Sequence, residues 1–183
     1  TAGSAALATA LDPFSPSPQA MSAASQIKNA CCTSGFFYIN NYPIRSGLEG
    51  QLDASARAFF KAEEEEKMKI AMKHGGKAWR GFFPVGGELT SGKPDIKEGV
   101  YFGYEAADDD ARVKRGLPLF GKNLFPEEVA SSAPSLDNNI AKLKPTVLEY
   151  MTSCETIGIG LTCLISMSLG LKPGAFLQAS CAD

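Results

Sequence analysis

The sequence contains one histidine, His74, and this scarcity limits the available chemistry more than any motif that is present. Histidine-based metal sites generally use two or three imidazoles, and Cys-His or Ser-His-Asp nucleophiles need an imidazole that a cleft can orient. The stretch Lys73-His74-Gly75-Gly76-Lys77 predicts the solvent-facing end of a helix that runs into a loop. We therefore expect His74 to be neither a metal ligand nor a catalytic base.

Cysteine pairs and long apolar runs are also scarce, and the net charge is small. The net charge of -2 gives no electrostatic reason to expect nucleic acid or an anionic membrane as partner. The most apolar stretch, residues 157–171, is too short and too interrupted by glycine to predict a membrane span, and the N-terminus lacks the basic start of a signal peptide. The cysteines are odd in number and form no CxxC pair, which predicts free, mostly buried thiols in a reducing compartment: Cys31, Cys32, Cys154, Cys163 and Cys181. We expect a cytoplasmic protein.

The remaining composition is that of a globular α+β chain. With 183 residues, 44% of them hydrophobic, the chain can form one domain or one domain plus part of another. Apolar periodicity predicts helices over 21–32 and 47–72, and a third from Leu136 to Leu169 that would be roughly 50 Å long at ~1.5 Å per residue. Pro145 either kinks this last helix or divides it from a preceding turn. Aromatic and β-branched runs predict strands at 36–39, 79–84 and 99–104.

Three polar motifs have ordinary structural interpretations. The run Glu63–Glu66 followed by Lys67 and Lys69 predicts a solvated helix face with two i,i+4 ion pairs, Glu63 with Lys67 and Glu65 with Lys69. A polar loop explains Asp108-Asp109-Asp110 at least as well as a cation site does. The stretch 87–94 nearly matches the phosphate loop GxxxxGK[ST], but Pro94 replaces the required hydroxyl, so we do not expect nucleotide binding.

An ordered series of segments carries a stronger signal than any single motif. The series comprises Cys31-Cys32-Thr33-Ser34-Gly35-Phe36-Phe37-Tyr38-Ile39-Asn40-Asn41, Ala56-Arg57-Ala58-Phe59-Phe60, Trp79-Arg80-Gly81-Phe82, Gly92-Lys93-Pro94-Asp95-Ile96-Lys97-Glu98-Gly99, Tyr101-Phe102-Gly103, Asn123-Leu124-Phe125-Pro126 and Ser166-Met167-Ser168-Leu169-Gly170-Leu171. In this order they resemble the N-terminal region of the 2-oxoglutarate- and Fe(II)-dependent oxygenases of the isopenicillin-N-synthase-like class. The resemblance extends from about Ala20 to Phe176. It departs at Asn40-Asn41-Tyr42-Pro43, where family members often have Asn-His-Gly.

The resemblance implies an α+β fold in which a helical and short-stranded N-terminal region packs against a double-stranded β-helix, or jelly roll. It assigns residues 1–19 to an extended lead-in and 20–130 to the N-terminal non-haem dioxygenase domain. Residues 131–183 would form the long supporting helix and the start of a barrel that is largely missing. Without the barrel, the apolar face of Leu161, Ile165 and Leu169 would be exposed and would favour self-association. The oligomeric state is left open.

The implied enzyme uses Fe(II) and 2-oxoglutarate to hydroxylate, desaturate or cyclise a small organic substrate. Family members hold iron with a His-x-Asp pair and a distant histidine, and they anchor 2-oxoglutarate with an Arg-x-Ser motif. None of these motifs occurs here, and Cys181-Ala182-Asp183 has a thiol in the histidine's place. We therefore expect no catalytic, cofactor-binding or metal-binding residues in this chain, and neither Fe(II) nor 2-oxoglutarate bound to it alone.

A substrate mouth is the one site that these residues suggest, because aromatic loops often line binding pockets. Its candidate residues are Trp79, Arg80, Lys97, Tyr101 and Tyr104. In the alternative interpretation, the aromatic side chains of this region simply pack between layers: Trp79, Phe82, Tyr101 and Phe102. The alternative function is a non-catalytic binding or interaction module that retains the N-terminal fold without the iron site.

Overall fold

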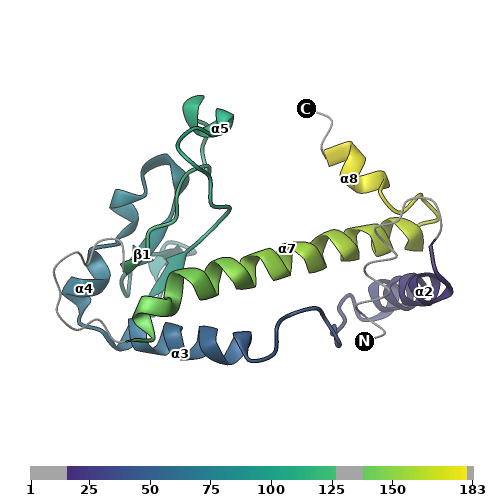
Figure 1. The fold of residues 1–183 in the computed structure, drawn as a ribbon, viewed down its shortest axis with the longest axis horizontal. Coiled ribbons are helices and arrows are strands. Elements are labelled where there is room, and N and C mark those ends of the chain that lie inside the picture. Colours follow the sequence, from purple (N-terminus) through teal and green to yellow (C-terminus); the bar gives the residue numbers. More distant parts are fainter. Residues whose placement is uncertain (1–15, 127–137, 181–183) are drawn as a thin grey trace. The chain divides into compact units, whose positions relative to one another are not determined.

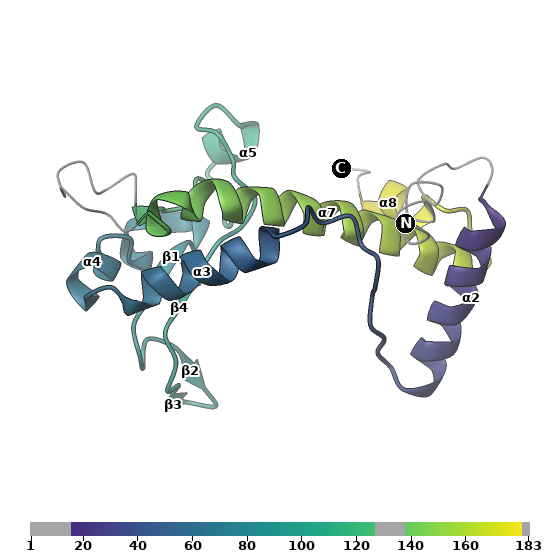
Figure 2. The ribbon, with the colours of Figure 1, turned by 60° about the horizontal axis from the view of Figure 1, so that its bottom comes forward.

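The computed structural model describes residues 16–126 and 138–180, which form two compact units (Figures 1 and 2). Unit 1 comprises the chain up to Ser46 together with the chain from Glu149 onward, and unit 2 comprises Gly47–Leu148. Helix α7 (Leu143–Ser168) begins in unit 2 and ends in unit 1. Within the described ranges, none of the helices combines the length and the apolar character needed to cross a membrane.

In unit 1, helix α2 (Pro18–Thr33) has both of its ends defined by local sequence. The Ser17 side chain accepts a hydrogen bond from the Ala20 N–H at 3.1 Å, and Pro18 occupies the first helical position, where its missing N–H costs nothing. Gly35 ends the helix with a φ of 79°, and its N–H donates to the Ala30 carbonyl at 2.9 Å. The predicted helix over 21–32, closed by Gly35, is confirmed with slightly wider bounds.

The core of unit 1 lies between α2 and the second half of α7. The buried residues of this core are Ala20, Ala24, Ile27, Cys163, Leu164 and Met167. Helix α8 (Ala175–Ser180) adds Leu177 at the edge of this core. Leu161 and Ile165 pack against it and are half-buried, so of the three residues predicted to be exposed only Leu169, directly after α7, is exposed.

The prediction of mostly buried thiols is wrong for the described cysteines. Cys31, Cys32 and Cys154 are exposed and free, whereas Cys163 is buried and free. Cys31 and Cys32 lie in the last turn of α2, beyond Ile27, where the core has ended. Burial raises the pKa of the Cys163 thiol. Cys181 lies outside the described residues.

Residues 36–39 do not form the predicted strand. Among the described residues, none forms a backbone ladder with this segment, and a strand cannot be defined without a hydrogen-bonded partner. Its four side chains are all exposed. Residues 36–39 therefore have the aromatic and β-branched composition of a strand, but no sheet among the described elements pairs with them.

Unit 2 contains the sheets and most of the shorter helices. Strand β1 (Gly81–Phe83) pairs antiparallel with β4 (Gly99–Tyr101) in the register Gly81 with Tyr101. The two predicted strands at 79–84 and 99–104 are confirmed in shorter form. The other elements are α3 (Leu48–Lys61), α4 (Glu64–Met68), η1 (Met72–His74), η2 (Gly76–Ala78), β2 (Leu89–Thr90), β3 (Lys93–Pro94), α5 (Ala111–Lys114) and η3 (Ile140–Lys142). The core includes Leu48, Phe59, Ile70, Phe82 and Phe125.

The predicted helix over 47–72 is interrupted at Ala62 and Glu63, where the backbone is extended with ψ of 157° and 146°. After this break Lys67 points inward and is 8% exposed. Its ammonium group lies 2.7 Å from the Glu98 carboxylate and donates to the Phe60 carbonyl at 3.3 Å. The predicted i,i+4 pairs are therefore wrong: Lys67 pairs with Glu98, and Lys69 pairs with Glu66 at 2.5 Å.

Helix α7 has 26 residues, which corresponds to about 39 Å rather than the predicted 50 Å. Pro145 is its third residue and lies in the first turn, where a backbone N–H has no intrahelical acceptor. The N–H that proline lacks therefore breaks no hydrogen bond, and Pro145 neither kinks nor divides the helix. Several hydroxyl side chains along α7 donate to the carbonyl four residues earlier: Ser153, Thr156, Thr162 and Ser166. The predicted start at Leu136 lies outside the described residues.

The stretch that resembles a phosphate loop is a β-hairpin. Strands β2 and β3 pair antiparallel, and the two residues between them, Ser91 and Gly92, both have positive φ values of 53° and 76°. Two central residues with positive φ form a type I′ turn, whose backbone twist matches the right-handed twist of the two strands that it connects. Because a hairpin rather than a helix follows the glycines, the loop lacks the helix N-terminus that would bind a phosphate.

Candidate substrate-mouth site

The β2–β3 hairpin brings two carboxylates together at its open end. Glu88 precedes β2 and Asp95 follows β3, and the Asp95 N–H donates to the Glu88 carbonyl at 2.9 Å. The Lys97 ammonium group lies 2.8 Å from the Glu88 carboxylate and 3.2 Å from that of Asp95. The Tyr101 hydroxyl, from β4, donates to the same Glu88 carboxylate. We call Glu88, Asp95, Lys97 and Tyr101 the Glu88 cluster.

Electrostatics within the Glu88 cluster favours its charged forms. The pKa of Glu88 is lowered mainly by a hydrogen bond from Lys97, with a smaller contribution from Tyr101. The pKa of Asp95 is lowered mainly by a hydrogen bond from Thr90, with a smaller contribution from Lys97. The bond to Glu88 raises the pKa of both Lys97 and Tyr101. Two carboxylates and one ammonium group thus give the cluster a single net negative charge at neutral pH. About half of the Lys97 side chain is exposed, so its donors can be reached by a polar ligand.

Arg80 is a structural anchor in this arrangement. It is 7% exposed, and its guanidinium donates to the Ala78 carbonyl at 2.7 Å and to the Leu119 carbonyl at 2.8 Å. Its Nε is buried without a hydrogen-bond partner among the described residues. The guanidinium lies directly over Gly103, and a Cβ at that position would overlap it. Gly103 is therefore required by the close approach of Arg80.

Asn123 fixes the backbone of Gly103 from the other side. Its side-chain oxygen accepts from the Gly103 N–H and its amide donates to the Gly103 carbonyl, both at 2.8 Å. Asn123 is 1% exposed. Two residues later, Phe125 stacks on Phe102 with the ring centroids 5.0 Å apart. The segments around Gly103 and Asn123 thus hold one another in place.

Tyr104 belongs to a different cluster. The Arg112 guanidinium lies between the Tyr104 ring, at 4.9 Å from its centroid, and the Phe120 ring, at 4.5 Å. Asp110 pairs with Arg112 at 2.7 Å and caps α5, and these bonds lower its pKa to about 2. Asp108 pairs with Lys122 at 2.6 Å. Across residues 16–126 and 138–180, no three metal-ligating side chains gather to form a cation site, at Asp108–Asp110 or elsewhere.

The structure thus brings together only two of the five predicted mouth residues, Lys97 and Tyr101. Trp79 has a positive φ of 57° and is 61% exposed, so it does not pack between layers as the alternative interpretation supposes. Phe82, in contrast, is fully buried. The sequence interpretation missed Glu88 and Asp95. The Ser91-Gly92 turn could have revealed them. A two-residue turn places residues that are equally far before and after it opposite each other, as Glu88 and Asp95 are.

A concave surface of unit 2 contains His74. It is an open groove of about 280 Å³, lined by basic side chains from three segments over an apolar floor: His74, Lys77, Lys122, Val113, Leu117, Phe120 and Leu124. His74 is exposed and ends the short helix η1, as its glycine and lysine neighbours predict. Lys122 is already paired with Asp108.

In fold, the chain is similar to the solved structure of a full-length Neurospora crassa protein in complex with alpha-KG. The TM-score is 0.61 at 23% sequence identity, over 91% of this chain and 46% of that one. In class, the chain matches the N-terminal region of the 2-oxoglutarate/Fe(II) oxygenase family. More particularly, it belongs to the family described as non-haem dioxygenase in morphine synthesis N-terminal, whose model matches residues 8–128. The predicted family is confirmed.

Curated relatives extend this similarity. A probable iron/ascorbate oxidoreductase of Dictyostelium discoideum is 41% identical over 151 residues, which cover 82% of this chain and 40% of the relative. A 1-aminocyclopropane-1-carboxylate oxidase of Dictyostelium mucoroides is 32% identical over 155 residues, covering 85% of this chain and 39% of the relative. The chain therefore spans about two fifths of the length of these relatives.

Proposed function

We propose that this chain is the front portion of a 2-oxoglutarate- and Fe(II)-dependent oxygenase that hydroxylates, desaturates or cyclises a small organic substrate. The family match over 8–128 carries the proposal, and the fold similarity to a 2-oxoglutarate-bound oxygenase supports it. The boundaries at 1–19, 20–130 and 131–183 belong to the same proposal. Fe(II) and 2-oxoglutarate would supply the oxidising chemistry when bound, with 2-oxoglutarate decarboxylated to succinate.

The described residues do not fit the iron site themselves. They contain one histidine, and they contain no group of three side chains that could hold a metal ion. In the proposal, the iron and 2-oxoglutarate ligands belong to polypeptide that the longer relatives possess, and the chain alone is inactive. We therefore derive no catalytic step from these residues.

In the proposal, the Glu88 cluster contributes to the substrate mouth. Lys97 offers exposed donors, and Glu88 and Asp95 offer acceptors that are already ionised. Such a rim can orient a polar or charged substrate, whereas Arg80 and Asn123 are engaged in holding the backbone. Trp79 remains a candidate as an exposed aromatic side chain, and Tyr104 as a ring that already contacts Arg112.

The direct test measures succinate formation from 2-oxoglutarate with Fe(II), ascorbate and dioxygen. We expect no turnover by the purified 183-residue chain. We expect turnover when residues 16–180 replace the matched part of the Dictyostelium discoideum relative, to give a chimera with the rest of that protein. Robust succinate formation by the chain alone would contradict the proposal.

The coding sequence beyond Asp183 distinguishes the oxygenase from the alternative function, a non-catalytic binding module. A reading frame that continues past Asp183 into a His-x-Asp motif supports the oxygenase. A stop codon directly after Asp183 in the intact gene supports the module.

A further inference from the structure

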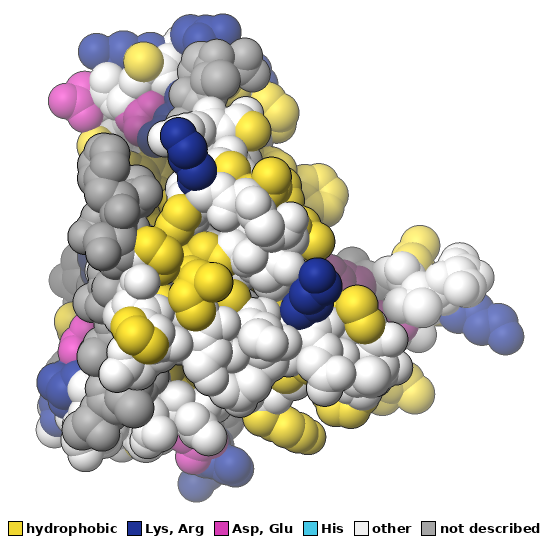
Figure 3. Space-filling model, turned by 90° about the vertical axis from the view of Figure 1, so that its right-hand side faces the viewer, with side chains coloured by type: hydrophobic (Ala, Val, Ile, Leu, Met, Phe, Trp, Pro, Cys, Tyr) yellow, Lys and Arg dark blue, Asp and Glu magenta, His cyan; other side chains and the backbone are white. Residues whose placement is uncertain are grey.

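Two open grooves on the chain differ in charge. The groove of unit 1, about 450 Å³, is lined by uncharged side chains that include Ile27 and Leu161, and apolar side chains gather on this end of the chain (Figure 3). The groove of unit 2, about 280 Å³, is lined by His74, Lys77 and Lys122 above apolar side chains. We call it the Lys77 groove. It offers a ligand cationic hydrogen-bond donors and apolar surface at the same place.

The walls of the Lys77 groove come from two stretches of sequence that carry cations and no acids. Residues 67–87 and 111–126 contain nine lysines and arginines, half of the chain's 18, and neither aspartate nor glutamate. The chain as a whole has a net charge of -2, so this positive charge is a local feature. A concave surface that carries charges of one sign raises the local concentration of ligands of the opposite sign. The groove therefore favours an anion.

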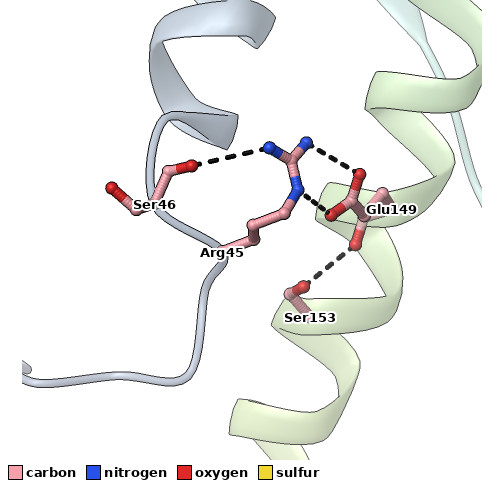
Figure 4. A network of polar contacts seen from close by, with 4 residues as sticks. All are labelled: Arg45, Ser46, Glu149 and Ser153. Carbon is pink, nitrogen blue, oxygen red and sulfur yellow. Dashed lines mark hydrogen bonds and ion pairs between the residues drawn. The ribbon is translucent and has the colours of Figure 1, made fainter.

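The Lys77 ammonium group is not engaged by a carboxylate, in contrast to other cations of the chain. In unit 1, Arg45 binds Glu149 with Nε at 2.6 Å and Nη2 at 3.0 Å from the two carboxylate oxygens (Figure 4). In the groove itself, Lys122 lies 2.6 Å from Asp108. Within residues 16–126 and 138–180, the Lys77 side chain has no hydrogen bond or ion pair. An exposed ammonium group in this state can donate to a ligand.

Bonds between its two walls fix the shape of the groove. The Leu119 N–H donates to the Lys77 carbonyl at 2.9 Å, and the buried Arg80 guanidinium joins the Ala78 and Leu119 carbonyls at 2.7 and 2.8 Å. Gly121 packs so closely on Ala78 that a Cβ on the glycine would lie 2.7 Å from the alanine Cβ. A ligand would thus meet walls that are already in place, which lowers the ordering cost of binding.

The cation of the groove lies close to an apolar floor. The Lys77 ammonium group reaches the opposite wall, where a Cβ on Gly116 would be 3.2 Å from its nitrogen. His74, exposed at the end of η1, adds an imidazole N–H as a further donor. The floor consists of half-buried apolar side chains, whose exposed parts a ligand would remove from water: Val113, Leu117, Phe120 and Leu124.

We propose that the Lys77 groove binds a small monocarboxylate with an apolar body, of the aryl- or alkyl-carboxylate class. The carboxylate lies against Lys77 and His74, and the body covers the floor. An inorganic anion would leave the floor in water, and an uncharged hydrocarbon would leave the ammonium group without a partner. One unpaired ammonium group also balances a single negative charge better than the two of a phosphate dianion.

This site is distinct from the proposed substrate mouth. It shares no residue with the Glu88 cluster, and it requires neither Fe(II) nor 2-oxoglutarate. The inference therefore does not rest on the proposed function, and the purified 183-residue chain is sufficient to test it.

Amide NMR spectra of the isotope-labelled chain, titrated with phenylacetate, provide the test. We expect the signals of the groove residues to shift with a Kd of roughly 1 mM, as for a small ligand in an open groove. Phenylacetamide, which lacks the charge, and 2-oxoglutarate, which lacks the apolar body, should each bind at least about 5-fold more weakly. If the isolated chain aggregates, the same titration is made with the chimera described above, because the groove lies within residues 74–124.

Three results of this titration would overturn the inference. The first is the absence of shifts at about 10 mM phenylacetate, ten times the expected Kd. The second is equal binding of phenylacetate and phenylacetamide, which would show that the ammonium group takes no part. The third is equal binding of 2-oxoglutarate, which would show that the floor takes no part.

Matched substitutions locate the binding. Lys77→Met should weaken phenylacetate binding about 5-fold, whereas Lys73→Met, at an exposed lysine of η1 that does not line the groove, should change it less than about 2-fold. Leu117→Ala should weaken binding about 3-fold, and Leu89→Ala, at a leucine that is 67% exposed in β2, should leave it unchanged. Equal effects within either pair, in variants whose spectra show the native fold, would contradict the assignment to the groove.

Discussion

The contact between Arg80 and Gly103 predicts a large effect from adding one methyl group. In Gly103→Ala the new Cβ would overlap the guanidinium, which is buried and cannot move without losing its bonds to two carbonyls. Hydrogen bonds to charged groups contribute about 1.5–3 kcal/mol each, so we expect the free energy of unfolding to fall by about 3–5 kcal/mol.

Urea unfolding followed by the fluorescence of Trp79 measures this change, because Trp79 is the sole tryptophan and lies in unit 2. The matched control is Gly50→Ala. Gly50 lies within α3 with open space around its Cα, so the substitution should raise the free energy of unfolding by about 0.5–1 kcal/mol.

A double-mutant cycle tests whether the effect acts through the guanidinium. In an Arg80→Met background the stem remains and the overlapping group is gone, so Gly103→Ala should cost less than about 1 kcal/mol. The reasoning is refuted if Gly103→Ala costs the same in both backgrounds, or if it changes the wild-type stability by less than about 0.5 kcal/mol.

Three further predictions concern other contacts. Asp110→Asn should lower stability at neutral pH, and because the folded pKa is depressed, the difference from wild type should be present above about pH 4 and vanish as the pH falls toward 2. Asp109→Asn, at an exposed neighbour, should change the stability by less than about 0.5 kcal/mol at neutral pH in the same thermal melts. Asn123→Ala should lower the free energy of unfolding by about 1–3 kcal/mol in urea, because it leaves partly buried backbone groups of Gly103 without their partner. With a thiol reagent, Cys154 should react in the native chain, whereas Cys163 should react only after urea is added.

The parts of the fold that could be predicted from sequence are those that depend on local chemistry. Helix α2 is bounded by Ser17 and Gly35, and each acts through residues within a few positions of itself. The β1–β4 pair was recognisable from two short aromatic runs. The break at Ala62 was not, and the Lys67–Glu98 pair that follows it joins residues 31 positions apart, which no local pattern indicates.

The candidate site was only partly predictable for the same reason. Lys97 and Tyr101 stand out as residue types, but their partner Glu88 is recognised only once the hairpin is known. Arg80 looks like a ligand-binding residue in sequence. The structure shows that its two terminal nitrogens donate to backbone carbonyls, and the farther of these lies 39 residues away in sequence.

The hydroxyl groups along α7 have a consequence for what can lie against this helix. Because side chains such as Ser153, Thr156 and Thr162 donate to carbonyls of their own helix, their hydrogen-bonding capacity as donors is already used. A segment that packs against these hydroxyl groups therefore needs to supply few hydrogen-bond acceptors to them. Dehydrating these positions costs less than their residue types suggest, so hydrocarbon side chains can cover them at a smaller penalty than hydroxyls with unsatisfied donors would impose.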